Sequence, residues 1–481
     1  MRKNVFRNGS LLYTVIIMLG ISGLTACTQA SEKVPTLIWW QVGNRQASFA
    51  QDEKVISDYI ESKIGVRVEF RIAGWADALT RLNTVVNAGE YFDIMFIDRL
   101  NYNRFVTMGA FADITDLVPE AVPALNGVIP EILWDGVRIN GRIFSVPTYK
   151  DSSATGFYFW DAAFVKKYNI DLTRSGWAYL DEAFRRVKAG EGQRFYPFYL
   201  ARGKSTHHFS NYDDLTIGFS PIGVRMDDQN RRVVFTLTQP DVMESLRYFH
   251  SWFQDGIINP DANLVQEVPM GRMFILEQAW PSVAVTFAKQ EGIERYEPAS
   301  FFGPYLSTGT IQGSMNAISA NSRNKEEALR LLELVNTDTT LRDMLAYGIE
   351  GKNFNYAEVD GRRVVHQLNT DTSLANYQQG NFFIVTPADD VPATYWDEVR
   401  QQNENAVPSV MMGFVMDQEP IMTELANVGA IWDRYRVDLT FGVIDPDEAL
   451  PEIIEQMKAA GLDKIIEESQ KQVDAFVANQ N

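Results

Sequence analysis

An alternation of strand and helix patterns near the start of the chain constrains the fold most. Three segments have the length and apolar pattern of strands: 36–40, 66–71 and 92–97. Two segments between them, 55–60 and 79–86, repeat apolar residues at helical spacing, and Gly65 and Gly89 mark the ends of the two predicted helices. Strand, helix, strand, helix and strand form a βαβαβ unit, which implies a parallel sheet with right-handed crossovers.

A sheet of this kind binds ligands beyond the carboxyl ends of its strands. The first strand ends at Trp40 and Gln41, and the third is followed by Asp98 and Arg99. Because neighbouring residues of a strand point to opposite faces, Trp39 and Trp40 cannot both face a ligand. Trp40 lies nearer the carboxyl end, so we expect Trp40, Gln41, Asp98 and Arg99 as ligand contacts and Trp39 in the core.

The rest of the chain continues the mixture of strands and helices. Asn140-Gly141 predicts a hairpin, and an aromatic strand at 157–160 precedes a helix from Ala162. Further helices are predicted over 177–187, 246–253 and 325–336, and in a tail over 453–477 that breaks at Gly461 and docks on a core. For the helix over 325–336, Asn324 is the predicted N-cap with Glu327 in a capping box. Residues 188–240 are rich in glycine and proline and predict loops, with Tyr212-Asp213-Asp214 in a solvated turn.

Length and composition exclude several classes of protein. With 481 residues, the chain is long enough for two or more domains or one two-lobed body. The net charge of −18 argues against nucleic-acid binding, which needs a basic surface. One cysteine excludes a disulfide framework and a zinc site built on cysteine pairs. The four histidines lack metal-ligand spacing, and we find no G-x-S-x-G elbow, P-loop or Rossmann fingerprint, so we expect no catalytic residues, metal or cofactor.

The N-terminus has the form of an export signal. Basic residues at the start precede an apolar run from Leu11 to Leu24, which is too short to span a bilayer comfortably. The run ends in Leu24-Thr25-Ala26-Cys27, which resembles the lipobox of bacterial lipoproteins. That resemblance implies a signal peptide over 1–26, a lipidated Cys27 that holds the protein on a membrane, and a polar tether within 27–35.

Several longer segments resemble one family in order and spacing. They are the aromatic end of the first strand, 87–94 before the third strand, 140–150, 158–161 and 318–328. Together they resemble the extracellular solute-binding proteins of bacterial ABC importers, of the type that binds oligosaccharides. Residues 347–354 and 460–472 are similar to a lipoprotein subgroup with a DUF3502-type C-terminal region.

The resemblance implies a periplasmic-binding-protein-like α/β fold, with two α/β lobes joined by crossover hinge segments and a helical C-terminal tail. The implied parts are a first lobe over 36–149, a second lobe over 150–305, a return to the first lobe over 306–338, and completion of the second lobe over 339–481. We expect a monomer on the outer face of the bacterial cytoplasmic membrane, with ABC permease subunits as partners.

The same resemblance implies further ligand contacts at the crossovers and in the second lobe: Lys150, Asp151, Trp280, Asn316, Tyr347 and Glu350. A sugar needs aromatic faces for its C–H patches and polar side chains for its hydroxyls, and these residues supply both. We therefore expect a lipid-anchored substrate-binding protein that takes up a sugar or oligosaccharide. Two alternatives remain open: the same fold binding a peptide, a modified sugar acid or another polar solute, and a secreted glycan-active enzyme.

Overall fold

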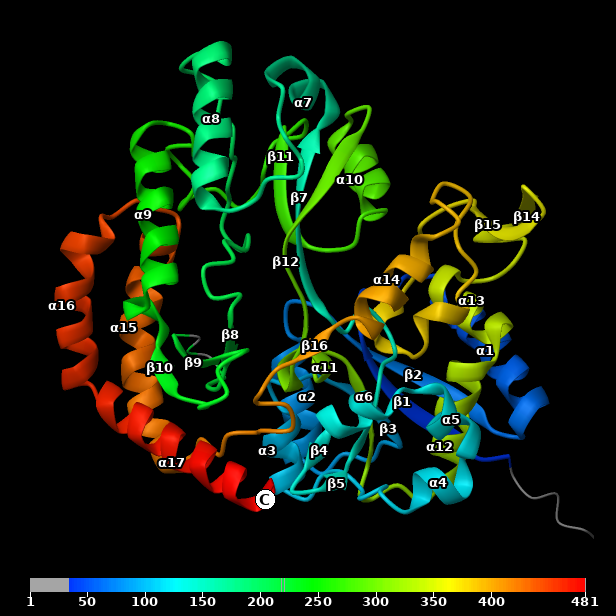
Figure 1. Ribbon diagram of the computed structural model, residues 1–481. Coiled ribbons are helices and arrows are strands. Elements are labelled where there is room, and N and C mark those ends of the chain that lie inside the picture. Colours follow the sequence, from blue (N-terminus) through cyan, green and yellow to red (C-terminus); the bar gives the residue numbers. More distant parts are fainter. Residues whose placement is uncertain (1–33, 218, 220, 481) are drawn as a thin grey trace, which may run out of the picture. The chain divides into compact units, whose positions relative to one another are not determined.

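The computed structural model describes residues 34–217, 219 and 221–480, and residues 35–481 form one compact unit. The predicted signal peptide and Cys27 lie outside the described residues. Among the described residues, no helix combines the length and the hydrophobicity that crossing a membrane requires. The unit contains two α/β lobes, which we call the N-lobe and the C-lobe (Figure 1).

A five-stranded sheet forms the centre of the N-lobe. Its order is β2-β1-β3-β13-β6. The strands are β1 (Thr36–Val42), β2 (Arg67–Ala73), β3 (Ile94–Ile97), β6 (Ser145–Pro147) and β13 (Met315–Ile318). Strand β1 pairs in parallel with β2 and β3, which confirms the predicted βαβαβ unit, whereas β13 runs antiparallel to β3 and β6.

Helices cover both faces of this sheet. The two predicted crossover helices are α1 (Phe49–Ile64) and α2 (Ala78–Asn87). The others of this lobe are α3 (Tyr102–Thr107), α4 (Leu117–Ala121), α5 (Pro123–Val128), α6 (Glu131–Gly136), α12 (Lys325–Thr337) and α13 (Thr339–Tyr347). Two hairpins complete it: the predicted one of β4 (Arg138–Ile139) and β5 (Arg142–Ile143), and β14 (Phe354–Val359) with β15 (Arg362–Gln367).

Two details of the N-lobe differ from the predictions. Leu341, Leu345 and Leu374 pack in its core, so this lobe continues well past the expected end of its return segment at residue 338. Asn324 does precede α12, but its side chain forms no cap; its amide donates instead toward Tyr91 and Asp93, 3.4 and 3.3 Å away. The tertiary contact therefore replaces the predicted capping box.

The C-lobe is built on a four-stranded sheet of order β11-β7-β12-β16. Its strands are β7 (Ala154–Asp161), β11 (Phe274–Gln278), β12 (Tyr296–Leu306) and β16 (Val407–Pro408). Tyr158 and Trp160 of β7 pack on one face of the sheet, and Phe157 and Phe159 pack on the other. The aromatic strand predicted from the sequence is thus buried on both sides.

Helices lie on both faces of this sheet as well. They are α7 (Ala162–Tyr168), α8 (Trp177–Glu191), α9 (Pro240–Gln254) and α10 (Val283–Glu291). The segment predicted as loops also holds a small sheet of β8 (Tyr212–Asp214), β9 (Ile222–Arg225) and β10 (Val233–Phe235), so the predicted solvated turn at 212–214 is a strand. These strands are only three or four residues long, which is too short for an alternating pattern to stand out in the sequence.

The C-terminal helices close the C-lobe beside the small sheet. They are α15 (Met422–Thr440), α16 (Pro446–Ala459) and α17 (Leu462–Gln480). Ile453, Met457, Ile465 and Val473 are buried in one core with β8, β9 and β10, which confirms that the tail docks through its apolar face. The break falls at Gly461, whose φ of 113° suits glycine.

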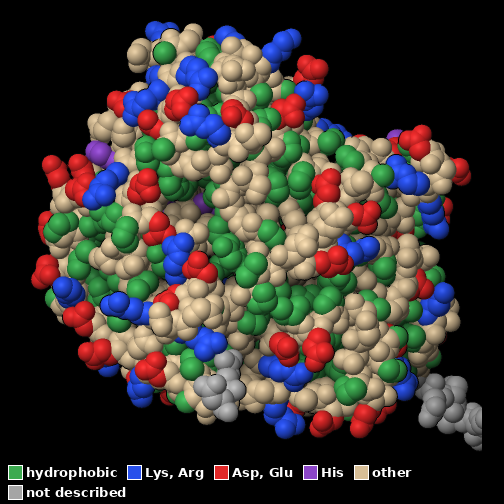
Figure 2. Space-filling view, in the orientation of Figure 1, with side chains coloured by type: hydrophobic (Ala, Val, Ile, Leu, Met, Phe, Trp, Pro, Cys, Tyr) green, Lys and Arg blue, Asp and Glu red, His purple; other side chains and the backbone are tan. Residues whose placement is uncertain are grey.

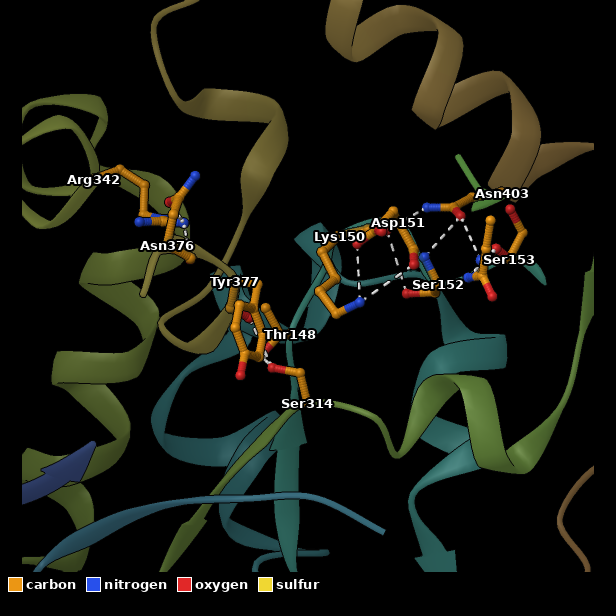
Figure 3. A network of polar contacts seen from close by, with 11 residues as sticks. Thr148, Lys150, Asp151, Ser152, Ser153, Ser314, Arg342, Asn376, Tyr377 and Asn403 are labelled. Carbon is orange, nitrogen blue, oxygen red and sulfur yellow. Dashed lines mark hydrogen bonds and ion pairs between the residues drawn. The ribbon is translucent and has the colours of Figure 1, made fainter. Parts of the chain in front are cut away.

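Three passages of the chain join the lobes, and polar contacts tie them together (Figure 3). The first runs from β6 to β7, the second from β12 through α11 (Thr308–Ile311) to β13, and the third through α14 (Tyr395–Glu404) to β16. Ser314 Oγ of the second lies 2.9 Å from Thr148 Oγ1 of the first and donates to the Tyr377 carbonyl oxygen at 2.7 Å.

Asn403 of α14 holds the first passage through three hydrogen bonds to its backbone. Its Oδ1 accepts from the N–H groups of Ser152 and Ser153 at 3.1 and 3.0 Å, and its Nδ2 donates to the Lys150 carbonyl oxygen at 2.6 Å. One amide side chain therefore satisfies the backbone at the point where the chain leaves one sheet for the other.

We expect Asn403→Ala to lower the free energy of unfolding by about 1–3 kcal/mol, because it leaves backbone groups of the first passage without partners. Denaturant unfolding followed by tryptophan fluorescence measures this. Gln401→Ala, an exposed position of the same helix, serves as the control and should change stability by less than about 0.5 kcal/mol. Equal stability of the two variants would contradict the clamping role of Asn403.

His208 anchors the segment before β8 inside the C-lobe. Its Nε2 lies 2.8 Å from the Thr440 carbonyl oxygen, to which it donates, and its Nδ1 lies 2.7 Å from Ser245 Oγ. The ring packs on Phe249 at 4.4 Å between centroids. Burial lowers the pKa of His208 from 6.5 to about 4.

This lowered pKa makes stability fall on acidification. Between pH 6.5 and 4 the unfolded chain binds a proton at His208 that the folded chain does not, so the free energy of unfolding decreases as the pH falls through that window. His208→Gln keeps a donor for Thr440 but has no group that titrates. We therefore expect the free energy of unfolding of this variant to fall by about 2 kcal/mol less between pH 6.5 and pH 5 than that of the unaltered protein. The exposed Gln401→Ala, which changes no titratable group, should leave the pH dependence of denaturant unfolding as it is in the unaltered protein.

Candidate functional site: the cleft between the lobes

An aromatic platform lies at the carboxyl ends of the parallel strands of the N-lobe. Trp75 follows β2 and is 50% exposed. It stacks on Tyr377, with 6.4 Å between ring centroids and 27° between planes, and Tyr377 meets the buried Phe96 edge-on at 5.9 Å. Asp98 directly follows β3 at the same edge of the sheet, and its charge adds to burial in raising the pKa of Tyr377. Trp75, Tyr377 and Asp98 thus form one surface.

Arg99 connects this surface to the C-lobe. Its guanidinium donates to both carboxylate oxygens of Asp214 on β8, at 2.9 and 2.5 Å. This bidentate geometry fixes both partners. The neighbouring Asp213 is buried; burial raises its pKa to about 6, and its Oδ2 has no hydrogen-bond partner within the described part of the chain.

A groove in the C-lobe begins at this ion pair. It consists of three cavities of about 50, 410 and 180 Å³ that share lining residues, and we call it the C-lobe groove. The smallest contains Arg99 and shares Asp214 with the largest, which in turn shares His207 and Phe302 with the third. The largest is also lined by Lys204, Tyr212 and Gln278. Figure 2 shows a band of apolar side chains across the middle of the face on which β8, β16 and α11 lie.

A second cavity, of about 510 Å³, lies between α10 of the C-lobe and the α13–β15 part of the N-lobe, and we call it the side cavity. Tyr347, Tyr395 and Trp396 supply its aromatic wall. Polar side chains complete its lining, among them Gln367, Asn376 and the ion pair of Lys289 with Asp390 at 2.8 Å.

The cleft therefore offers exposed ring faces beside hydroxyl, amide and carboxylate groups on both lobes. Ring faces suit the C–H patches of a sugar, and such polar groups suit its hydroxyls. Because the C-lobe groove consists of three adjoining cavities, it fits an elongated or branched ligand better than a small compact one.

The structure brings five of the ten predicted contacts to this cleft and places a sixth, Trp280, behind the side cavity. Asp98 and Arg99 lie at the end of β3, and Tyr347 lines the side cavity while donating to the Thr386 carbonyl oxygen at 2.8 Å. Lys150 and Asp151 pair at 2.9 Å in the first passage, and Asp151 is close enough to Tyr395 to affect its pKa, which burial raises to about 12. Trp280 packs behind the side cavity, 5.2 Å from Tyr395 and 6.4 Å from Trp396.

Trp40, Gln41 and Asn316 lie inside the N-lobe instead, and the structure corrects their predicted exposure to a ligand. Trp40 is 4% exposed, and Gln41 accepts from the Gln379 amide at 2.7 Å. Asn316 accepts from Trp39 Nε1 at 3.0 Å and donates to the Gln378 carbonyl oxygen at 2.7 Å.

The physical reason is that the segment 373–381 covers the end of β1: Gln378 both accepts from the Val42 N–H and donates to its carbonyl oxygen, at 2.8 and 2.9 Å. Both tryptophans of β1 are therefore core, as is usual for a parallel strand that is covered on both faces. Glu350 is exposed beside a bridge to Phe354 and lines neither the C-lobe groove nor the side cavity.

Several residues of the cleft were not predicted from the sequence. Trp75 carried a signal, since it is an aromatic residue directly after the second strand. Tyr377, Lys204, Gln278 and Phe302 carried none, because they reach the cleft only through tertiary packing.

Comparisons with known proteins agree with this architecture. Residues 54–350 match the model of the bacterial extracellular solute-binding protein family, and residues 410–478 match a domain of unknown function, DUF3502. A carbohydrate ABC transporter substrate-binding protein of Streptococcus pneumoniae is 25% identical, over 95% of this chain and 96% of that protein.

Solved structures show the same fold. The N-glycan transport solute binding protein NgtS of Streptococcus pneumoniae superposes with a TM-score of 0.83 at 23% identity, over 93% of this chain and 100% of that one. Its complex with Man5GlcNAc gives 0.70, over 93% and 99%. An extracellular solute-binding protein of Bifidobacterium longum subsp. infantis gives 0.63 at 16% identity, over 93% and 99%.

The fold is thus that of the periplasmic binding proteins, with two α/β lobes around a cleft and a helical C-terminal region. The family match covers more than half of the chain, from α1 to the end of α13. We conclude that this chain belongs to the bacterial extracellular solute-binding proteins.

Proposed function

We propose that this protein is the substrate-binding component of an ABC importer, that it captures an oligosaccharide in the cleft between its lobes, and that it delivers this solute to a membrane permease. Ligand contacts with both lobes would favour the closed arrangement, by hinge motion about the three passages. The protein acts by binding and release and not by catalysis.

One observation supports the oligosaccharide most: the Trp75–Tyr377 platform on one lobe adjoins, through the Arg99–Asp214 pair, a groove with Phe302, Tyr212, Lys204 and Gln278 on the other. The names of the relatives point the same way, because they describe binding proteins for carbohydrates and N-glycans. The side cavity provides additional room for a branched or longer ligand.

We further propose that lipid on Cys27 anchors the protein to the outer face of the cytoplasmic membrane, where it acts as a monomer. The support is the sequence: a basic and apolar leader ends directly before the chain's one cysteine. More than one acyl chain on that residue would give stable attachment, since each buried CH₂ contributes about 0.8 kcal/mol.

We expect Trp75→Ala and Phe302→Ala each to weaken oligosaccharide binding about tenfold or more, because each removes a ring face from one side of the cleft. Calorimetric titration with the best ligand from a glycan panel, selected by thermal shift, measures the effect. Leu79→Ala serves as a control, since Leu79 is also 50% exposed and follows soon after Trp75 in the sequence. Absence of binding across the whole panel would contradict the oligosaccharide assignment.

Cys27→Ser should release the protein from the membrane. Fractionation of cells that express the full chain, with metabolic labelling by a fatty acid, measures this. We expect the unaltered protein to be labelled and in the membrane fraction, and the variant to lose both properties. An unaltered protein that takes up no label would contradict the anchor.

A further inference from the structure

We propose that the cleft selects uncharged oligosaccharides and rejects sugars that carry carboxylates. This inference rests on the proposed function and adds the chemical class of the ligand. It follows from how the charged side chains around the cleft are paired.

In the C-lobe groove, each lysine or arginine that lines the cavities already has a carboxylate partner. Arg99 is bound by both oxygens of Asp214. Lys204 lies 3.7 Å from Glu277, a residue of β11. A carboxylate of a ligand would have to displace one of these partners and leave a side-chain carboxylate beside its own charge.

The same pairing holds around the passages and in the side cavity. Lys150 pairs with Asp151 at 2.9 Å, and Lys289 pairs with Asp390 at 2.8 Å. The lysines that line these parts of the cleft are thus each paired with a carboxylate, and Arg342, which donates to Asn376 of the side cavity, is fully buried out of reach of a ligand.

The charges that remain are negative. Asp98 and Asp213 have no salt-bridge partner among the described residues, and neither does Glu244, which lines the 180 Å³ cavity. Burial raises the pKa of Asp98, and it raises that of Asp213 to about 6, which leaves Asp213 mostly ionised at neutral pH. An anionic ligand would therefore meet uncompensated negative charge and no free cation in the described part of the cleft.

Neutral sugars meet no such penalty. Their hydroxyls can donate to the outward oxygens of paired carboxylates and accept from amide, hydroxyl and lysine N–H groups without breaking an ion pair. Paired charges held in place also keep these donors and acceptors oriented before the ligand arrives.

The test uses pairs of glycans that have the same sugar residues and differ in a carboxylate. One pair is a sialylated biantennary N-glycan and the same glycan with its sialic acid carboxylates converted to neutral methyl esters; the other is a glucose tetramer and its form with one C6 hydroxymethyl group oxidised to a carboxylate. Binding to the mature protein is measured by calorimetric titration or on a glycan array at fixed ionic strength. We expect each neutral member that binds to do so at least about tenfold more tightly than its charged counterpart.

Two variants change the pairing directly. Asp214→Asn releases Arg99 and Glu277→Gln releases Lys204, so each should raise the affinity for the sialylated glycan relative to the neutral one. Asp447→Asn is the matched control: it releases Arg247 from an exposed pair at 2.7 Å on the α9–α16 surface and should leave the ratio of the two affinities as it is.

The outcomes separate the two claims. If the forms that carry a carboxylate bind as tightly as the neutral forms, or if neither variant shifts the ratio, the charge selection is wrong while the oligosaccharide function stands. If no glycan of any charge binds, the proposed function fails and the charge selection fails with it.

Discussion

The arrangement of the two lobes depends on how the backbone is satisfied where the chain changes from one sheet to the other. Strands β6 and β7 are separated by a few residues that belong to neither sheet, and their polar groups need partners. Asn403 provides three of these through a single amide, and Ser314 links the neighbouring passage to Thr148 and to the Tyr377 backbone. These few hydrogen bonds hold together the passages that connect the lobes, and the residues of the cleft lie on either side of them.

The cleft itself reflects a division between fixed and variable parts. The segment 373–381 covers strand β1 and its tryptophans. This strand therefore belongs to the core and offers no side chain to a ligand. Side chains on connections and on short strands, such as Trp75, Tyr377 and Lys204, form the surface that a ligand meets. Such connections can vary between relatives without disturbing the core.

Regular patterns in the sequence predicted the framework well. Apolar spacing over residues 36–97 predicted strands and helices that the structure contains, and the aromatic run at 157–160 predicted a strand. The burial of a residue by a distant segment could not be predicted from the sequence. Nothing near Gln41 indicates that residues more than 300 positions later bury it. For the same reason the sequence around Asp214 predicted a solvated turn: its partner Arg99 lies 115 positions away, so no nearby residue indicated the ion pair.

The bond between Gln378 and the Val42 backbone has a consequence for how the chain folds. Its two residues are 336 positions apart, and Leu374 belongs to the same core as β1. The N-lobe therefore cannot be completed until the chain has been synthesised as far as residue 378, because that residue covers the end of β1. Contacts so distant in sequence are formed late and slowly.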